Sequence, residues 1–345
     1  MFCAPANIEN YSKNGTCYSK EALEKMADLW NAGHPSKSRI ALGKGSKEIY
    51  KELTDKLSDK CKGKGEWCYA DVLGYETGKH FFRPPRPSSW NRNRYEWLSN
   101  FDIEHVMKQY EEDKRMCFRF LGVFPIDFAT GGKGGRCLYH SMCNPELFKG
   151  LRSQGIRNVG AVFNLDRHDQ PGSHWVSMFI GLDPSLPSYG ANYYDSVANP
   201  TPREIADFME SVKKDVGDPD FPLRVNKVKH QTKNSECGIF SMVFIIRFLE
   251  AYKREQPISM DQILTNKVQI TNKPFGDTDA NEIRNVLFRP HTIGTQRGGR
   301  KKSPKKKVKK SPNQKKKVNT PRKRNVKKKI SSPRKRKLRA KRSTK

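Results

Sequence analysis

Apolar residues in the first part of the chain repeat at helical spacing. One predicted helix follows Ser19, a residue type that caps helices, and ends at Gly33. Its apolar face is formed by Leu23, Met26, Ala27 and Trp30. A second predicted helix begins at Ser46, and its apolar face is formed by Ile49, Leu53 and Leu57. These helices predict a helical N-terminal extension over residues 1–88, which ends in a proline-rich linker at residues 83–89.

Residues 89–292 have the mixed pattern of an α+β domain. Ser99 and Asp102 have the spacing of a capping box, and the helix they predict has an apolar face at Ile103, Val106, Met107 and Tyr110. After a glycine-rich loop at residues 129–136, short runs rich in Val, Phe and Tyr predict three strands in succession, at 159–164, 174–182 and 191–195. The remaining predictions are a helix over 202–213, a weaker strand over 223–229 and a last helix over 279–288.

The segment from residue 237 to residue 249 is apolar on nearly every helical face. A helix of this kind is normally buried at the centre of a domain. We therefore expect an α+β fold in which a central sheet packs against one buried helix.

The formal net charge of +31 comes mainly from the end of the chain. Residues 297–345 hold 26 of the 67 Lys and Arg residues and no Asp or Glu, which leaves 41 basic residues and all 36 acidic ones in the first 296. Residues 293–345 contain no core-forming pattern, so we expect a disordered basic tail. Residues 297–345 should bind DNA without sequence preference. A nuclear localisation signal and a solubilising tail are the alternatives.

The 8 cysteines of the chain have no CxxC spacing. A zinc site is therefore not predicted, and we expect neither a metal nor another cofactor. The first residues lack the features of a signal peptide, and no stretch approaches the roughly 20 apolar residues of a membrane helix. We expect an intracellular protein with no membrane partner, in which most cysteines are free thiols.

Cys237 is the strongest candidate for a reactive residue. It follows a polar loop and lies at the first turn of the predicted buried helix, where unpaired N–H groups favour a thiolate. Its own backbone N–H could donate to an oxyanion that forms beside it. Gln231, earlier in the same loop, could supply a second donor from its side-chain amide.

His174 and Asp195 are the candidate base and orienting residue. His174 begins one predicted strand and Asp195 ends the next, so that neighbouring strands would bring the carboxylate to the imidazole. A cysteine at a helix start or a histidine at a strand end is more often structural than catalytic. The prediction therefore depends on these residues occurring together.

Four separated motifs resemble the proteases that cleave SUMO and other ubiquitin-like modifiers, and the adenovirus-type maturation proteases. In chain order they are Trp97-Leu98, His174-Trp175, Tyr194-Asp195-Ser196 and Gln231-x5-Cys237-Gly238. The resemblance covers about residues 90–292. The helical extension and the opening Cys3-Ala4-Pro5 look most like the polyprotein endopeptidases of large cytoplasmic DNA viruses, of the African swine fever virus type. Asp195 is a departure, since that type has Asn there, but either residue can orient an imidazole.

The resemblance implies a papain-like or adenain-like core that cleaves after Gly-Gly sites in a protein substrate. Trp175 would line the substrate tunnel, or would serve only as a core tryptophan. The favoured function is viral polyprotein processing and virion maturation, in the virion and host cytoplasm. The alternatives are a nuclear protease for SUMO or another modifier and a catalytically idle, DNA-associated virion protein. Gly298-Gly299, at the start of the tail, would be a site of self-cleavage.

Overall fold

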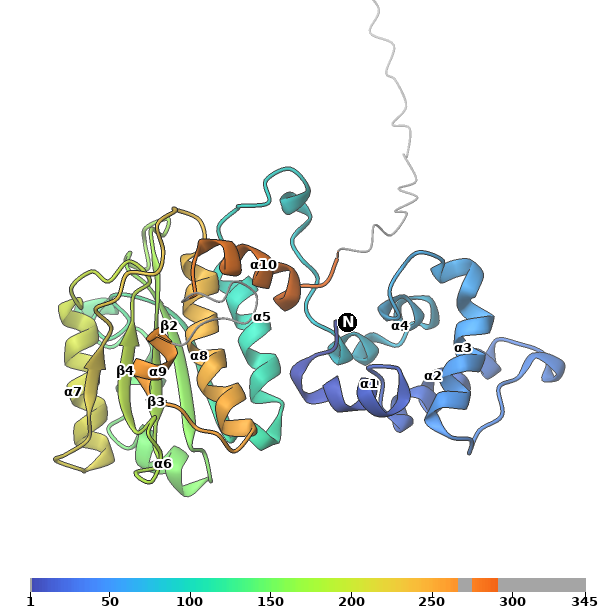
Figure 1. Cartoon of the computed structure of the whole chain (residues 1–345), viewed down its shortest axis with the longest axis horizontal. Helices are drawn as coiled ribbons and strands as arrows, with labels where there is room; N and C mark the ends of the chain where they lie inside the picture. The colour runs from blue at the N-terminus through green and yellow to red at the C-terminus, as the bar shows by residue number, and fades with distance from the viewer. Residues whose placement is uncertain (1, 266–274, 291–345) are drawn as a thin grey trace, which may run out of the picture. The chain divides into compact units, whose positions relative to one another are not determined.

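The computed structural model describes residues 2–265 and 275–290 (Figure 1). These residues belong to one compact unit that ends at Gly294. The predicted tail over 293–345, its DNA binding and the Gly298-Gly299 pair lie outside the described residues.

The N-terminal region is helical, as predicted, and has a hydrophobic core of its own. Its α-helices are α1 (Ile8–Asn14), α2 (Lys20–Ala32), α3 (Ser46–Cys61) and α4 (Trp67–Leu73). Ser19 caps α2 by accepting a hydrogen bond from the Ala22 N–H (3.2 Å), and all the apolar residues predicted for the inner face of α2 are buried. α1 and α4 were not predicted, because helices of 7 residues depend on tertiary packing more than on their own pattern.

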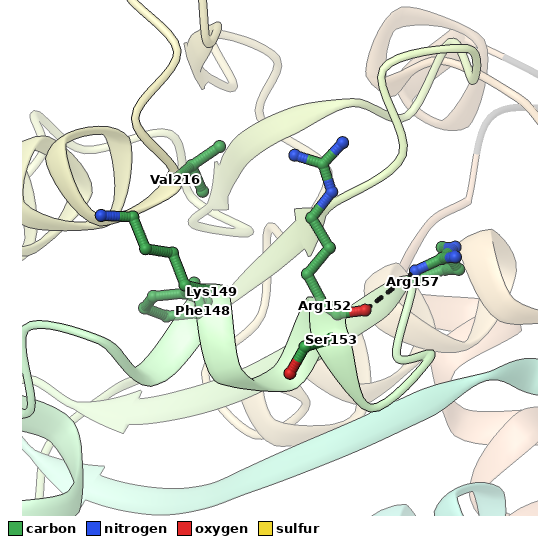
Figure 2. Close-up of a pocket in the computed structure, with 6 residues that line it drawn as sticks. All are labelled: Phe148, Lys149, Arg152, Ser153, Arg157 and Val216. Carbon is green, nitrogen blue, oxygen red and sulfur yellow. Dashed lines mark hydrogen bonds between the residues drawn. The ribbon is translucent and has the colours of Figure 1, made fainter.

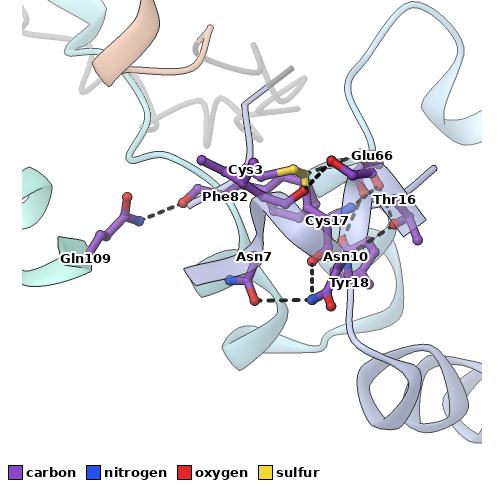
Figure 3. Close-up of a disulfide and its surroundings, with 11 residues drawn as sticks. Cys3, Asn7, Asn10, Thr16, Cys17, Tyr18, Glu66, Phe82 and Gln109 are labelled. Carbon is purple, nitrogen blue, oxygen red and sulfur yellow. Dashed lines mark hydrogen bonds between the residues drawn. A yellow bond between two sulfur atoms is a disulfide. The ribbon is translucent and has the colours of Figure 1, made fainter. Parts of the chain in front are cut away.

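The expectation of mostly free thiols is wrong for the described structure. Disulfides join Cys3–Cys17, Cys61–Cys68 and Cys137–Cys143, and Cys117 and Cys237 remain free. Free thiols were expected from a reducing intracellular environment. The fold instead brings each pair to a Cα–Cα distance of 5.2 to 6.4 Å, the usual range for a disulfide. Figure 3 shows Cys3–Cys17 beside Glu66, which accepts a hydrogen bond from the Thr16 hydroxyl (2.6 Å).

A five-stranded sheet has the order β1-β2-β3-β4-β5. The strands are β1 (Phe118–Pro125), β2 (Asn158–Asn164), β3 (Trp175–Gly181), β4 (Gly190–Tyr194) and β5 (Leu223–Val225). β1 pairs in parallel with β2 and β4 with β5, whereas β3 is antiparallel to both of its neighbours. The three successive strands were predicted. β1 was missed, and its pairing is interrupted by a register shift between Phe120 and Gly122.

Helices cover both faces of the sheet (Figure 1). On one face lie α5 (Asn100–Glu111) and α8 (Cys237–Lys253), and on the other α6 (Leu147–Ser153) and α7 (Arg203–Val216), each layer with its own hydrophobic cluster. α9 (Met260–Thr265) and α10 (Asp277–Leu287) follow α8. Short 3-10 helices lie at Pro5–Asn7, Ser36–Ser38, Glu76–Phe81, Ser88–Asn91, Lys114–Met116, Lys133–Gly135 and His140–Cys143.

α8 is the buried central helix that its apolar sequence predicts. Phe248 of α8 stacks on Phe179 of β3 with ring centroids 4.1 Å apart, and Phe244 stacks on Tyr194 at 4.6 Å. The central sheet and buried helix confirm the predicted fold class. No described helix is both long and apolar enough to cross a membrane.

Candidate active site

Three elements meet at one end of the sheet. His174 immediately precedes β3, Asp195 immediately follows β4, and Cys237 is the first residue of α8. Because β3 and β4 are antiparallel neighbours, the start of one lies beside the end of the other. The topology thus brings the three predicted residues together, although the first and the last are 63 residues apart in the sequence.

Asp195 is fully buried and accepts a hydrogen bond from His174 Nε2 at 2.7 Å. Its oxygens also accept from the backbone N–H groups of Val197 (3.0 Å) and Asn199 (3.1 Å). Burial alone would raise the pKa of Asp195, but these hydrogen bonds hold it below its ordinary value of 3.8. The carboxylate is therefore ionised at neutral pH and fixes the orientation of the imidazole.

Asn226 holds the backbone of Asp195 in place, a role for which the sequence contains no signal. Its side-chain oxygen accepts from the Asp195 N–H (2.7 Å), and its amide donates to the Asp195 carbonyl (2.8 Å). Asn226 is buried, and a lone asparagine 31 residues from its partner has no spacing that could be recognised in the sequence.

Cys237 lies close enough to His174 to raise the pKa of its imidazole, as Asp195 also does. Since Asp195 occupies Nε2, Nδ1 is the ring nitrogen left to face the sulfur. Burial alone would lower the pKa of His174, but the hydrogen bonds to Asp195 and Cys237 and their negative charges raise it from 6.5 to about 9. At neutral pH the imidazole is thus protonated, and a cation of this kind stabilises negative charge on a neighbouring sulfur.

Cys237 lies at the start of a helix of 17 residues and is 2% exposed. The backbone N–H groups of this first turn have no partner within the helix, so they are available to an anion. Gly238 is needed next to it, because a Cβ there would lie 3.1 Å from Leu98 and 3.2 Å from Trp175. The absence of a side chain at Gly238 lets the start of α8 approach both residues.

Gln231 is buried in the loop that leads to Cys237, and its side chain is held at both ends. Its oxygen accepts from the Ser196 hydroxyl (2.6 Å), and its amide nitrogen donates to the Lys233 carbonyl (2.5 Å). The backbone N–H of Gln231 also donates to the Ser196 carbonyl (2.9 Å). One N–H of the amide remains for another acceptor.

Trp175 is buried beside the candidate site, and its indole N–H donates to the Leu98 carbonyl (3.0 Å). It lines a cavity of about 500 Å³ together with Leu98 and with Trp97, which is 46% exposed. The predicted helix start near Trp97 is confirmed, since Ser99 and Asp102 form both hydrogen bonds of a capping box at the start of α5.

Other cavities lie away from these residues. The cavity in Figure 2 has a volume of about 360 Å³ and is lined by Phe148, Lys149, Arg152, Ser153, Arg157 and Val216. A larger one, of about 790 Å³, involves residues of α6 and α7. His174, Asp195 and Cys237 line none of these three cavities, but Trp175, the neighbour of His174, lines the cavity of about 500 Å³. Within residues 2–265 and 275–290, no group of three or more His, Cys, Asp or Glu side chains could hold a metal ion.

Comparisons with known sequences identify the class of protein to which the chain belongs. It is 29% identical over 317 residues to a protein of Acanthamoeba polyphaga mimivirus described as a thiol protease, and the match covers 83% of this chain and 93% of that one. It is 26% identical to a cysteine protease of African swine fever virus, over 58% of this chain and 79% of the relative. The chain is a cysteine-type peptidase.

A family model matches the part of the chain that contains the candidate site. Residues 161–285, which include His174, Asp195, Gln231 and Cys237, match the model of the Ulp1 protease family, C-terminal catalytic domain. The crystal structure of an African swine fever virus protease has the same fold, with a TM-score of 0.53 and 18% identity over 84% of this chain and 96% of that one. The resemblance inferred from the sequence motifs is confirmed.

Proposed function

We propose that the chain is an endopeptidase in which Cys237 is the nucleophile, His174 the proton carrier and Asp195 the residue that orients it. The observation that carries the proposal is that His174 bonds to Asp195 (2.7 Å) at the end of the sheet where Cys237 begins α8, and that Cys237 raises the pKa of the imidazole. A cysteine beside an imidazole that a carboxylate orients is the set of groups used in nucleophilic catalysis by a thiolate.

The reaction proceeds through a thioester. Cys237 Sγ attacks the carbonyl carbon of the scissile bond, and the carbonyl oxygen becomes an oxyanion. His174 then gives its proton to the leaving nitrogen as the C–N bond breaks. In the second half, His174 removes a proton from water, the hydroxide attacks the thioester, and the carboxylate product leaves the regenerated thiolate.

The oxyanion is stabilised by the backbone N–H of Cys237 and by the free N–H of Gln231. The support is that Ser196 and Lys233 fix the amide of Gln231 in a buried position within the same loop. A donor held before the reaction begins does not have to reorganise in the transition state, which is why such groups are effective.

Substrate selectivity for small residues follows from the close packing around Gly238. Leu98 and Trp175 pack so closely on this glycine that an added Cβ would be crowded. We infer that the same two side chains narrow the approach to Cys237. The cavity beside Trp175 would take the residues that precede the cleaved bond. A Gly-Gly pair before the scissile bond fits such an entrance.

The substrate is a viral precursor protein, because both relatives described above are viral proteases whose matches extend over most of their length. A SUMO-like modifier with a C-terminal Gly-Gly is a second candidate substrate, because African swine fever virus relatives are described as SUMO-1 cysteine proteases. Cleavage of Gly-Gly precursor peptides and of SUMO-like fusions, assayed side by side, separates the two. Faster cleavage of the folded modifier fusion would move the assignment to a deconjugase, with nuclear localisation in place of the virion and host cytoplasm.

A further inference from the structure

A buried ion pair involves the residue immediately before the candidate nucleophile. Glu236, the residue before Cys237, accepts two hydrogen bonds at one carboxylate oxygen, from Arg284 Nε (3.1 Å) and Nη2 (2.9 Å). The side chains of Glu236 and Arg284 are only 1% and 3% exposed. Because both charged groups are removed from water, each depends on the hydrogen bonds of the other, and the two side chains are held in one geometry.

The remaining surface of Arg284 is also occupied. Nη1 donates to the Glu96 carbonyl (2.7 Å), and the guanidinium lies over the ring of Trp90 at 4.4 Å from its centroid. The planar group is therefore fixed from three sides. Arg284 is on α10, far along the chain from the motifs that define the candidate site.

The other end of the same loop is attached to α10 as well. Asp277, the first residue of α10, accepts hydrogen bonds from the backbone N–H groups of Thr232 (3.0 Å) and Lys233 (3.4 Å) and from the Thr232 hydroxyl. Asp277 and Arg284 are seven residues apart and so share one face of the helix. α10 thus holds the loop both near Gln231 and at Glu236.

From this geometry we propose that α10 is the element that positions the nucleophile loop, with Arg284 and Asp277 as its positioning residues. The inference rests on the proposed function of Cys237. Neither residue is catalytic: Arg284 acts through Glu236, and Asp277 acts through the backbone next to Gln231. Without Arg284, the Glu236 carboxylate would be an unpaired buried charge on the residue that precedes Cys237.

Single substitutions in the full-length chain test the proposal. Arg284→Met removes the charge and keeps the length of the side chain, Arg284→Lys keeps the charge and loses the planar fork, and Asp277→Ala releases the other end of the loop. Arg94→Met is the matched control, because Arg94 also bonds to α10, at Asn281 (2.9 Å), but in an exposed position. The double variant Glu236→Gln/Arg284→Met leaves no unpaired buried charge.

Two readouts are measured on variants whose thermal unfolding remains cooperative. The first is kcat and KM on a Gly-Gly peptide, and the second is the rate of Cys237 alkylation by iodoacetamide, with Cys117 as the internal reference. We expect kcat to fall by at least about tenfold in Arg284→Met and Asp277→Ala, with KM changed by less than about threefold, because small displacements of reacting groups are costly. Arg284→Lys should recover part of the loss, and Arg94→Met should match the wild type.

The double variant and Asp277→Ala keep the test decisive if Arg284→Met does not fold. An unchanged kcat and an unchanged alkylation rate of Cys237 in Asp277→Ala and in either folded Arg284 variant would overturn the positioning role. If the wild type cleaves no Gly-Gly substrate, the proposed function fails, but the alkylation rates still decide whether α10 positions the thiol.

Discussion

At the residue scale, the candidate site is defined by the charges of Asp195 and His174 beside Cys237. Asp195 keeps its charge because backbone N–H groups and His174 compensate its burial, and it thereby keeps the pKa of His174 high. Because that pKa is raised from 6.5 to about 9, the stabilisation that protonation gives is complete below pH 6.5 and is lost as pH rises through about 9.

Replacement of Asp195 by Asn should show this coupling. The variant keeps an oxygen that can accept from His174 but removes the negative charge, so the alkaline limb of kcat/KM should move down by about one pH unit. Measurement of kcat/KM across the neutral and alkaline range checks this. An alkaline limb at the same pH in both proteins would show that the charge of Asp195 does not control His174.

Gln231→Ala tests the oxyanion donor. Loss of one preorganised donor should lower kcat by roughly 10²-fold and leave the melting temperature within a few degrees, provided that Ser196 finds another acceptor. Steady-state kinetics and thermal unfolding of the same preparation give both numbers. A kcat within twofold of the wild type would mean that the amide serves only to brace Ser196 and Lys233.

At this scale the sequence was sufficient to select three residues that the fold brings together, but not the residues that hold them in place. His174, Asp195 and Cys237 have types and positions that suggest chemistry, whereas Asn226, Glu236 and Arg284 have meaning only through partners 31 or 48 residues away. Such contacts are set by tertiary packing, and no local pattern encodes them.

At the element scale, α8 and its surroundings show why the pattern was informative. Nearly every side chain of α8 is buried, so its apolar sequence could belong only to a central helix. The strands rich in Val, Phe and Tyr were recognised for a similar reason, because both of their faces are covered. β1 and the short helices escaped prediction, since their stability comes from neighbours more than from their own residues.

Gly238→Ala tests the packing of α8 against its neighbours. The new methyl group would lie 3.1 Å from Leu98 and 3.2 Å from Trp175, so we expect a loss of about 1–3 kcal/mol of stability and a higher KM as Trp175 shifts. Gly150→Ala in α6 is the matched control, because nothing lies within 4 Å of its added Cβ. It should stabilise the protein by about 0.5–1 kcal/mol. Equal effects of the two substitutions would contradict the close approach at Gly238.

At the scale of the whole molecule, the order of the described regions could be predicted from the sequence, but the state of the cysteines could not. Three disulfides form because the fold brings pairs of cysteines together. The expectation of a reducing environment contains no information about these distances. The basic tail remains a prediction from composition, since its residues are outside those the structure describes.

Truncation after residue 296 tests the tail. Because the first 296 residues carry 41 basic and 36 acidic side chains, most of the salt dependence of DNA affinity should disappear with the tail. Titration of duplex DNA at several salt concentrations gives the slope for each protein. An unchanged slope in the truncated chain would place the DNA contacts on the folded part.

Self-cleavage after Gly299 is a separate prediction for the same region. Mass spectrometry after long incubation should find a fragment ending at Gly299 in the wild type and not in Cys237→Ala. A wild-type chain that stays intact would count against it.

The central claim is that Cys237 is the nucleophile of a protease that accepts Gly-Gly before the cleaved bond. The most direct test is a peptide ending in Gly-Gly with a C-terminal vinyl methyl ester, whose alkene adds to a thiolate held at the scissile position. Peptide mapping by mass spectrometry then locates the thioether. The account predicts one adduct per chain, at Cys237, formed in the wild type and lost in His174→Ala. An adduct at Cys117, or equal labelling at Cys237 without His174, would contradict it.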